Sequence, residues 1–195
     1  MKKIFSKIDY NSPVVLSFAF ISLIVLLLGY MTNNWTTMTF FCVYRSPVTD
    51  LLGYVRLFGH VLGHANLSHY INNMMMLLLA GPMLEEKYGS RLLLEMILIT
   101  AFVTGIVNVM LFSTGLLGAS GIVFMMIILS SVTSVKEGKI PLTLIVVVIL
   151  YLGEQIAAGI LSADNISQLT HIVGGVCGGI FGLLLQNKRN GSFDQ

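Results

Sequence analysis

Residues 117–124 read Leu-Gly-Ala-Ser-Gly-Ile-Val-Phe, and the rest of this sequence is best understood from this stretch. It places Ser120 among small residues at the predicted start of an apolar helix. Small residues let helices approach closely in a membrane, and a serine at such a contact commonly serves packing alone. A hydroxyl in this position can also act as a nucleophile if a base lies nearby. The positions of the histidines decide between the two interpretations.

The composition identifies the class of protein. Of the 195 residues 55% are hydrophobic and 10% charged, with a mean hydropathy of +0.86. These values exclude a soluble globular domain and indicate a polytopic membrane protein. The scattered basic residues predict no nucleic-acid partner, and Cys42 and Cys177 show no disulfide or metal-type spacing.

Hydropathy predicts an all-α membrane protein with six transmembrane helices in one bundle. The first span lacks a small-residue cleavage site, so we expect it to be retained rather than removed as a signal peptide. We expect one polytopic domain with a short N-terminus (1–12), a core (13–187) and a short tail (188–195). The predicted spans are Pro13–Met31, Leu67–Leu84, Leu92–Phe112, Leu116–Val135, Ile140–Ala158 and Ile166–Gln186.

The basic residues predict the orientation of these spans. If the N-terminus is cytoplasmic, all of the 11 Lys and Arg residues except Arg45 and Arg56 lie on the cytoplasmic side. This is the positive-inside pattern, so we expect a cell-membrane protein with both termini in the cytoplasm. The second, fourth and sixth spans then begin at the outer surface, which predicts a similar shallow depth for His69, Ser120 and His171.

These polar residues suit acyl-transfer chemistry. A neutral histidine near pH 7 can take the proton of a serine hydroxyl, so Ser120 and His171 can form a nucleophile and base pair. Asp164 is about two helical turns from His171, and no triad is predicted. Donors for an oxyanion are available from Asn73, the ring of His69 and the backbone N–H of Ser120.

The sixth span is built for close helix contact. Gly174, Gly178 and Gly182 recur at four-residue spacing, and His171 begins a second stripe with Gly175 and Gly179. Small residues on one helix face let another backbone approach. Packing alone explains these glycines but not the imidazole that shares their stripe.

Three motifs together resemble the rhomboid family of intramembrane serine proteases. They are His64-Ala-Asn-Leu-Ser-His-Tyr-Ile-Asn-Asn73, Gly118-Ala-Ser-Gly121 and His171-Ile-Val-Gly-Gly175. Arg56 resembles the arginine of the family's first-loop Trp-Arg pair, and Gly81-Pro-Met-Leu-Glu85 resembles its Gly-x-x-x-Glu turn. The resemblance spans about Arg56 to Gly182.

This resemblance implies a function for the chain. Ser120 would be the nucleophile, His171 the general base, and His69 with Asn73 the oxyanion donors, with no cofactor. The fold would be a six-helix bundle with a water-filled cavity open to the outer face. The substrates would be single-span membrane proteins in the lipid bilayer. The supporting residues would be Gly118, Gly121, Phe124, Arg56, His64 (bracing the first loop), Glu85 and Gly175.

Two positions depart from the family's pattern. Phe124 stands where many members carry a tyrosine four residues after the serine, and Val55 replaces the tryptophan of the Trp-Arg pair. Neither departure removes a chemical group that the Ser120 and His171 pair requires. The alternative is a catalytically inactive rhomboid-like protein that binds membrane helices for quality control. A transporter is disfavoured because the inner halves of the spans carry few polar residues.

Other polar residues have simpler interpretations. His60 and His64 share one side with His69 and His171, but no Cys or well-spaced carboxylate joins them, so we expect no metal site. The long segment Thr32–Asn66 suits the outer headgroup region because of its apolar runs.

Acidic residues also lie near the ends of the predicted spans. Glu85 and Glu86 are predicted to be solvated turn residues, although Glu85 could bond to the turn backbone. Glu154, near the outer end of the fifth span, is a minor candidate for a gating role, and Gln155 beside it must face protein or water.

Overall fold

The structure, a computed structural model, describes residues 10–132, 142, 145–146, 149 and 165–190. Regular structure in this part of the chain is helical, apart from one antiparallel bridge between Val43 and Leu116. The predicted all-α fold is therefore confirmed. The helices are α2 (Pro13–Met31), α3 (Trp35–Phe40), α4 (Leu51–Gly59), the 3-10 helix η1 (His60–Leu62), α5 (Leu67–Tyr88), α6 (Ser90–Leu111), α7 (Ser120–Val132) and α9 (Asn165–Asn190).

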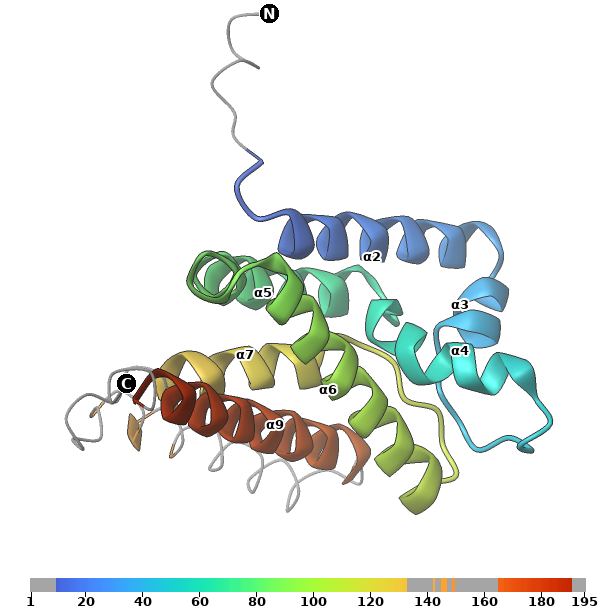
Figure 1. The fold of residues 1–195 in the computed structure, drawn as a ribbon. Coiled ribbons are helices and arrows are strands. Elements are labelled where there is room, and N and C mark those ends of the chain that lie inside the picture. The colour runs from blue at the N-terminus through green and yellow to red at the C-terminus, as the bar shows by residue number, and fades with distance from the viewer. Residues whose placement is uncertain (1–9, 133–141, 143–144, 147–148, 150–164, 191–195) are drawn as a thin grey trace, which may run out of the picture.

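The long helices form a bundle in which α6 contacts each of the others. Helix α2 packs on α5, helices α7 and α9 lie side by side, and α6 touches all four of them (Figure 1). The first loop, residues 32–66, folds into α3, α4 and η1 and packs against α2 and α6. Most of the fifth predicted span, including Glu154 and Gln155, lies outside the described residues, as does Asp164.

Apolar side chains fill the centre of the bundle and also cover its outside. Leu77, Leu93, Ile122 and Met125 are fully buried between α5, α6 and α7. Large apolar side chains such as Leu79, with 76% of its surface accessible, point outward. The stretches Pro13–Met31, Ser90–Leu111 and Gln168–Gln186 are long and apolar enough to cross a membrane. These features describe an integral membrane protein.

The predicted first and second spans begin where the helices begin. Helix α2 has the predicted bounds, and α5 starts at Leu67 because the Asn66 side chain accepts a hydrogen bond from the His69 N–H at 2.9 Å. Such an N-cap satisfies a donor that the first helical turn cannot pair internally.

The predicted end of the second span is wrong. Helix α5 continues past Leu84 to Tyr88, and only Gly89, at φ +81°, separates it from α6. Glycine adopts this backbone conformation without the strain that a side chain would cause. The polar run at residues 85–88 is therefore the last turn of a helix and not a loop.

Glu85 is buried, which corrects its assignment as a solvated turn residue. Its Oε1 accepts hydrogen bonds from the Val14 N–H at 2.9 Å and the Ser90 hydroxyl at 2.7 Å, and its Oε2 accepts one from the Val15 N–H at 3.0 Å. A carboxylate is favourable here because the first N–H groups of α2 are unpaired and carry the positive end of its dipole. Glu86 is exposed, as predicted.

Gly81 supports the same junction from one turn earlier in α5. A methyl group on Gly81 would lie 2.6 Å from a methyl carbon of Val15, so only glycine lets α2 approach here. The Gly-x-x-x-Glu motif therefore lies within α5 and holds this helix against the start of α2.

The predicted start of the fourth span is also wrong. Helix α7 begins at Ser120 and not at Leu116, because Leu116 pairs with Val43 in the bridge and Gly118 has a φ of +126°. An extended segment, residues 112–119, therefore leads into α7. Ser120 is the first residue of the helix, four residues earlier in its span than predicted.

Candidate active site

The contact between α7 and α9 is a direct meeting of backbones. A methyl group on Gly174 would overlap the carbonyl oxygen of Gly121, and one on Gly178 would overlap that of Met125. Gly182 continues this stripe against the side chain of Val132. Gly175, from the other stripe, is buried, whereas a methyl group on Gly179 would only reach 3.9 Å from Ile128.

This close contact brings the surroundings of Ser120 and His171 together. Gly121, next to Ser120, faces Thr170, next to His171, and a methyl group on Gly121 would lie 3.2 Å from the Thr170 methyl carbon. One turn after Ser120, the ring of Phe124 contacts the ring of His171, with centroids 4.5 Å apart. Both Ser120 and His171 are half-buried.

The segment before Ser120 is held by the first loop and by α6. Val43 and Leu116 exchange two backbone hydrogen bonds of 2.9 and 2.8 Å, and the Gly118 N–H donates to the His60 carbonyl at 2.9 Å. The Asn108 amide donates to the carbonyls of Val43 and Thr114 at 3.2 and 3.1 Å. Sequence reasoning gave Asn108 no role, because its partners lie in other segments of the chain.

Gly118 is where the second span meets this segment. A methyl group at Gly118 would lie 2.8 Å from both Cε1 and Nε2 of His69 and 3.9 Å from Nδ2 of Asn73. His69 and Asn73 are one turn apart on α5, and the Asn73 amide donates to the His69 carbonyl at 3.1 Å. An amide carries two hydrogens, so a second one remains for another acceptor. Two polar side chains thus lie beside the backbone two residues before Ser120.

Arg56 anchors the first loop. Its guanidinium donates to the Thr39 carbonyl at 2.8 Å and to Asp50 at 2.9 Å, and it lies 4.4 Å from the centre of the Tyr44 ring. This pairing holds the pKa of the Asp50 carboxyl below its usual range. Asp50 in turn accepts from the Leu52 N–H and caps α4. Val55, beside Arg56, is 52% exposed and makes no comparable anchor.

His60 and His64 are buried under this loop. His60 contacts the Arg56 carbonyl through Nδ1 at 3.2 Å and the Thr104 hydroxyl through Nε2 at 3.3 Å. His64 contacts the Leu62 carbonyl through Nδ1 at 3.1 Å, and its ring packs on those of His69 and Tyr70. Burial lowers the pKa of each imidazole from 6.5 to about 4. Both are therefore neutral at pH 7.

No group of three His, Cys, Asp or Glu side chains within the described ranges could hold a metal ion. His60 and His64 instead contact carbonyl oxygens of their own loop. The sequence predicted His60 to be a loop histidine whose ring finds partners nearby. Its backbone carbonyl in addition accepts the hydrogen bond of the Gly118 N–H.

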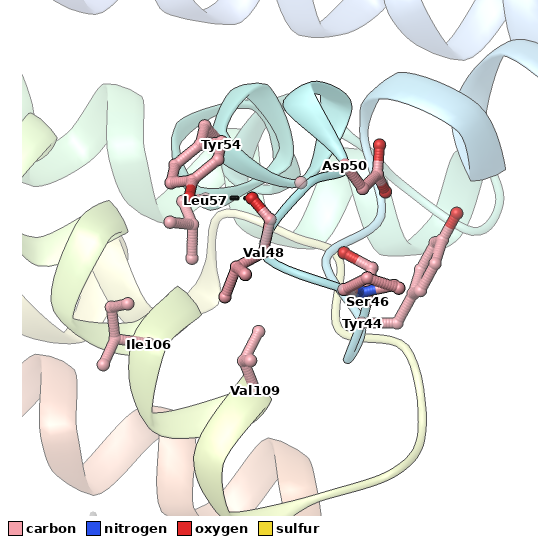
Figure 2. A pocket seen from close by; sticks show the side chains of 10 residues that line it. Tyr44, Ser46, Val48, Asp50, Tyr54, Leu57, Ile106 and Val109 are labelled. Carbon is pink, nitrogen blue, oxygen red and sulfur yellow. Dashed lines mark hydrogen bonds between the residues drawn. The ribbon is translucent and has the colours of Figure 1, made fainter.

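A separate hollow of about 150 Å³ lies between the first loop and α6. Figure 2 shows Tyr54, Val48, Leu57, Ile106 and Val109 around it, with the Tyr54 hydroxyl donating to the Val48 carbonyl at 3.0 Å. None of the predicted catalytic residues lines this hollow. Val48 and Leu51 are 83% and 78% exposed, so this part of the loop presents apolar side chains outward.

Comparison with known protein families gives a match. The family model described as the Rhomboid domain matches residues 52–188, which is more than half of the chain. No curated protein matches the sequence significantly.

Proposed function

Because this chain belongs to the rhomboid family, we propose that it is an intramembrane serine protease that cuts membrane-protein substrates within the bilayer. The observation that carries the proposal is the arrangement around Gly118. His69 and Asn73 lie beside the backbone that leads into Ser120, and the His171 ring lies one turn further on, against Phe124.

In the proposed reaction Ser120 is the nucleophile and His171 the general base. The Ser120 oxygen bonds to the scissile carbonyl carbon while His171 takes the hydroxyl proton. The tetrahedral intermediate collapses as His171 returns this proton to the leaving amine, which gives an acyl-enzyme. Water then attacks the ester carbon with His171 again as the base, and this step releases the acid product and regenerates Ser120.

The developing oxyanion needs donors that are already in place. His69 and Asn73 supply side-chain N–H groups, and the N–H of Ser120 is one of the unpaired donors of the first turn of α7. Loss of one such donor lowers kcat by about 10²- to 10³-fold in other serine hydrolases. None of these steps uses a metal or an organic cofactor.

The depth of the site also supports a membrane-embedded substrate. The N-terminal ends of α5, α7 and α9 meet at the site, and the positive-inside pattern puts these ends near the outer face. We propose that single-span proteins enter from the lipid and that water reaches the site from the outer side, with both termini of the chain cytoplasmic.

The test uses a fluorophosphonate probe on the detergent-solubilised full-length protein. We expect labelling of the wild type and none of Ser120→Ala, with an unchanged unfolding midpoint. The matched control is Ser131→Ala on the same helix, since the Ser131 hydroxyl only donates to the Ile127 carbonyl. Labelling that persists in Ser120→Ala, or disappears in Ser131→Ala, would reject Ser120 as the nucleophile.

Phe124 and Val55 favour one competing function. If the wild type binds a single-span substrate in proteoliposomes but neither cleaves it nor reacts with the probe, the chain is a non-catalytic binder of membrane helices. Cleavage that disappears in both Ser120→Ala and His171→Ala supports the protease.

A further inference from the structure

We propose that the first turn of α5 locks His69 in the tautomer that carries its proton on Nε2, with Asn66 as the positioning residue. This inference deepens the proposed function, because only that tautomer can donate to an oxyanion from Nε2. It concerns a proton position and an additional residue, neither of which follows from the roles of Ser120 and His171.

The contacts of the His69 ring define the proton position. The Ala65 N–H points at Nδ1 of His69 over 3.4 Å. A backbone N–H can only donate, so Nδ1 must present its lone pair. A proton on Nδ1 would instead set two N–H groups against each other. A neutral imidazole has one N–H, which therefore lies on Nε2.

Nε2 is also the nitrogen that faces the site. It lies 2.8 Å from the point where a Gly118 side chain would begin, and Nδ1 faces back into the turn before α5. The opposite tautomer would aim a lone pair at the developing oxyanion. An oxyanion hole needs donors at this position, so that tautomer would be inactive.

Asn66 fixes the turn that carries the Ala65 N–H. Its side-chain oxygen accepts from the His69 N–H at 2.9 Å, and its carbonyl accepts from the Tyr70 N–H at 3.1 Å. These two hydrogen bonds hold residues 65–69 in a fixed turn. The ring of His69 cannot turn over without losing the contact with Ala65.

The two histidines of the first loop have the opposite arrangement. Nδ1 of His60 faces the Arg56 carbonyl at 3.2 Å, and Nδ1 of His64 faces the Leu62 carbonyl at 3.1 Å. A carbonyl only accepts, so both rings carry the proton on Nδ1. The histidine at the proposed oxyanion site therefore differs from its two neighbours in the same protein.

Imidazole ¹⁵N spectra test this assignment directly. The experiment uses full-length Ser120→Ala protein with ¹⁵N-labelled histidine in detergent at about pH 8, where no turnover is needed. The chain has four histidines, and single His→Gln variants assign their signals. We expect His69 as the Nε2–H form and His60 and His64 as the Nδ1–H form. His69 found as the Nδ1–H form, or as an equal mixture, would overturn the proposal.

Substitution of Asn66 tests its positioning role. In Asn66→Ala we expect His69 to populate both tautomers and kcat to fall by up to about 100-fold, the loss of one oxyanion donor, with little change in KM. Asn66→Asp keeps the acceptor oxygen and should restore both readouts. Asn72→Ala is the matched control, because Asn72 is exposed on the same helix. An unchanged tautomer in Asn66→Ala would remove Asn66 from the proposal.

The two proposals fail in different ways. A wild type with the expected tautomers but no hydrolysis would reject the protease and leave the tautomer assignment standing. Hydrolysis by a wild type whose His69 is the Nδ1–H form would support the protease and reject the tautomer assignment.

Discussion

The α7–α9 contact and the first loop both support Ser120, but they are stabilised in different ways. At the α7–α9 contact, side chains are missing, and Gly174 and Gly178 let the backbones touch. In the first loop, polar and charged side chains hold the chain through hydrogen bonds to other segments, such as Arg56 to the Thr39 carbonyl and His60 to the Thr104 hydroxyl. We therefore expect added side-chain volume to destabilise the α7–α9 contact. Loss of a hydrogen bond or addition of a charge should destabilise the first loop.

The strongest way to break the helix contact is to add one methyl group. Gly174→Ala would drive a carbon into the Gly121 carbonyl, and backbone on both sides cannot move aside. We expect a loss of at least about 3 kcal/mol in the free energy of unfolding, at the upper end of overpacking effects. Thermal unfolding in detergent would measure this loss.

The matched control is Gly179→Ala in the same helix. The added methyl group would have ordinary space there, so we expect a change within about 0.5 kcal/mol. Equal effects of the two substitutions would show that the close approach of α7 and α9 is not what stabilises the bundle.

Acid should break the first loop through its buried histidines. Unfolding restores the pKa of His60 from about 4 to about 6.5, so below pH 6.5 the unfolded chain binds a proton that the folded chain cannot. The contribution of His60 to stability is complete above pH 6.5, falls by about 3 kcal/mol as the pH drops to 4, and then levels off.

The measurement is the unfolding midpoint in a pH series from 8 to 4. In His60→Gln the unfolding midpoint should fall less steeply with decreasing pH. The remaining fall should come from His64, whose pKa is also about 4. A slope that stays at the wild-type value in His60→Gln would contradict the buried neutral state of His60.

Removal of the Arg56 guanidinium also tests the hydrogen bonds of the first loop, with a smaller expected loss of stability. Arg56→Ala removes two charge-assisted hydrogen bonds and the contact with Tyr44, so we expect a loss of about 2 kcal/mol. The control is Arg91→Ala, whose pair with Glu95 is 94% and 49% exposed. That loss should stay below about 1 kcal/mol. Equal losses in the two variants would show that burial adds nothing to the Arg56 pair.

The smallest expected effect concerns the ring beside His171. Phe124→Tyr adds a hydroxyl to a side chain that already contacts the imidazole, so one further hydrogen bond of about 1 kcal/mol would raise kcat about fivefold. Phe124→Leu removes the ring contact and should lower kcat. Identical kcat values for all three proteins would show that this contact does not affect turnover.

Sequence patterns predicted the parts of the fold that depend on local chemistry. The charge-free run fixed the bounds of α2, and Asn66 with the apolar residues after it marked the start of α5. The N-terminal ends of α5, α7 and α9 could be assigned to one level because the spans alternate in direction. The prediction failed for particular residues whose pairing partners lie far away in the chain.

Glu85 and Leu116 illustrate this limit. Glu85 looked solvated because its donors, Val14 and Val15, are some 70 positions earlier in the chain. Leu116 looked helical because hydropathy does not reveal that it pairs with Val43. The roles of Asn108 and of the His60 carbonyl depend on the same long-range contacts, so no local pattern marked them.

The carboxylate of Glu85 also bears on how much of the chain makes a working unit. Helix α2 precedes the region matched by the family model, yet its first two N–H groups donate to this buried carboxylate together with the Ser90 hydroxyl. A shortened protein that starts at residue 52 would deprive the buried Glu85 carboxylate of two of its donors and uncover Gly81 on α5. The smallest autonomous version of this molecule therefore includes its leading helix, and expression of the matched region alone should yield material that does not fold.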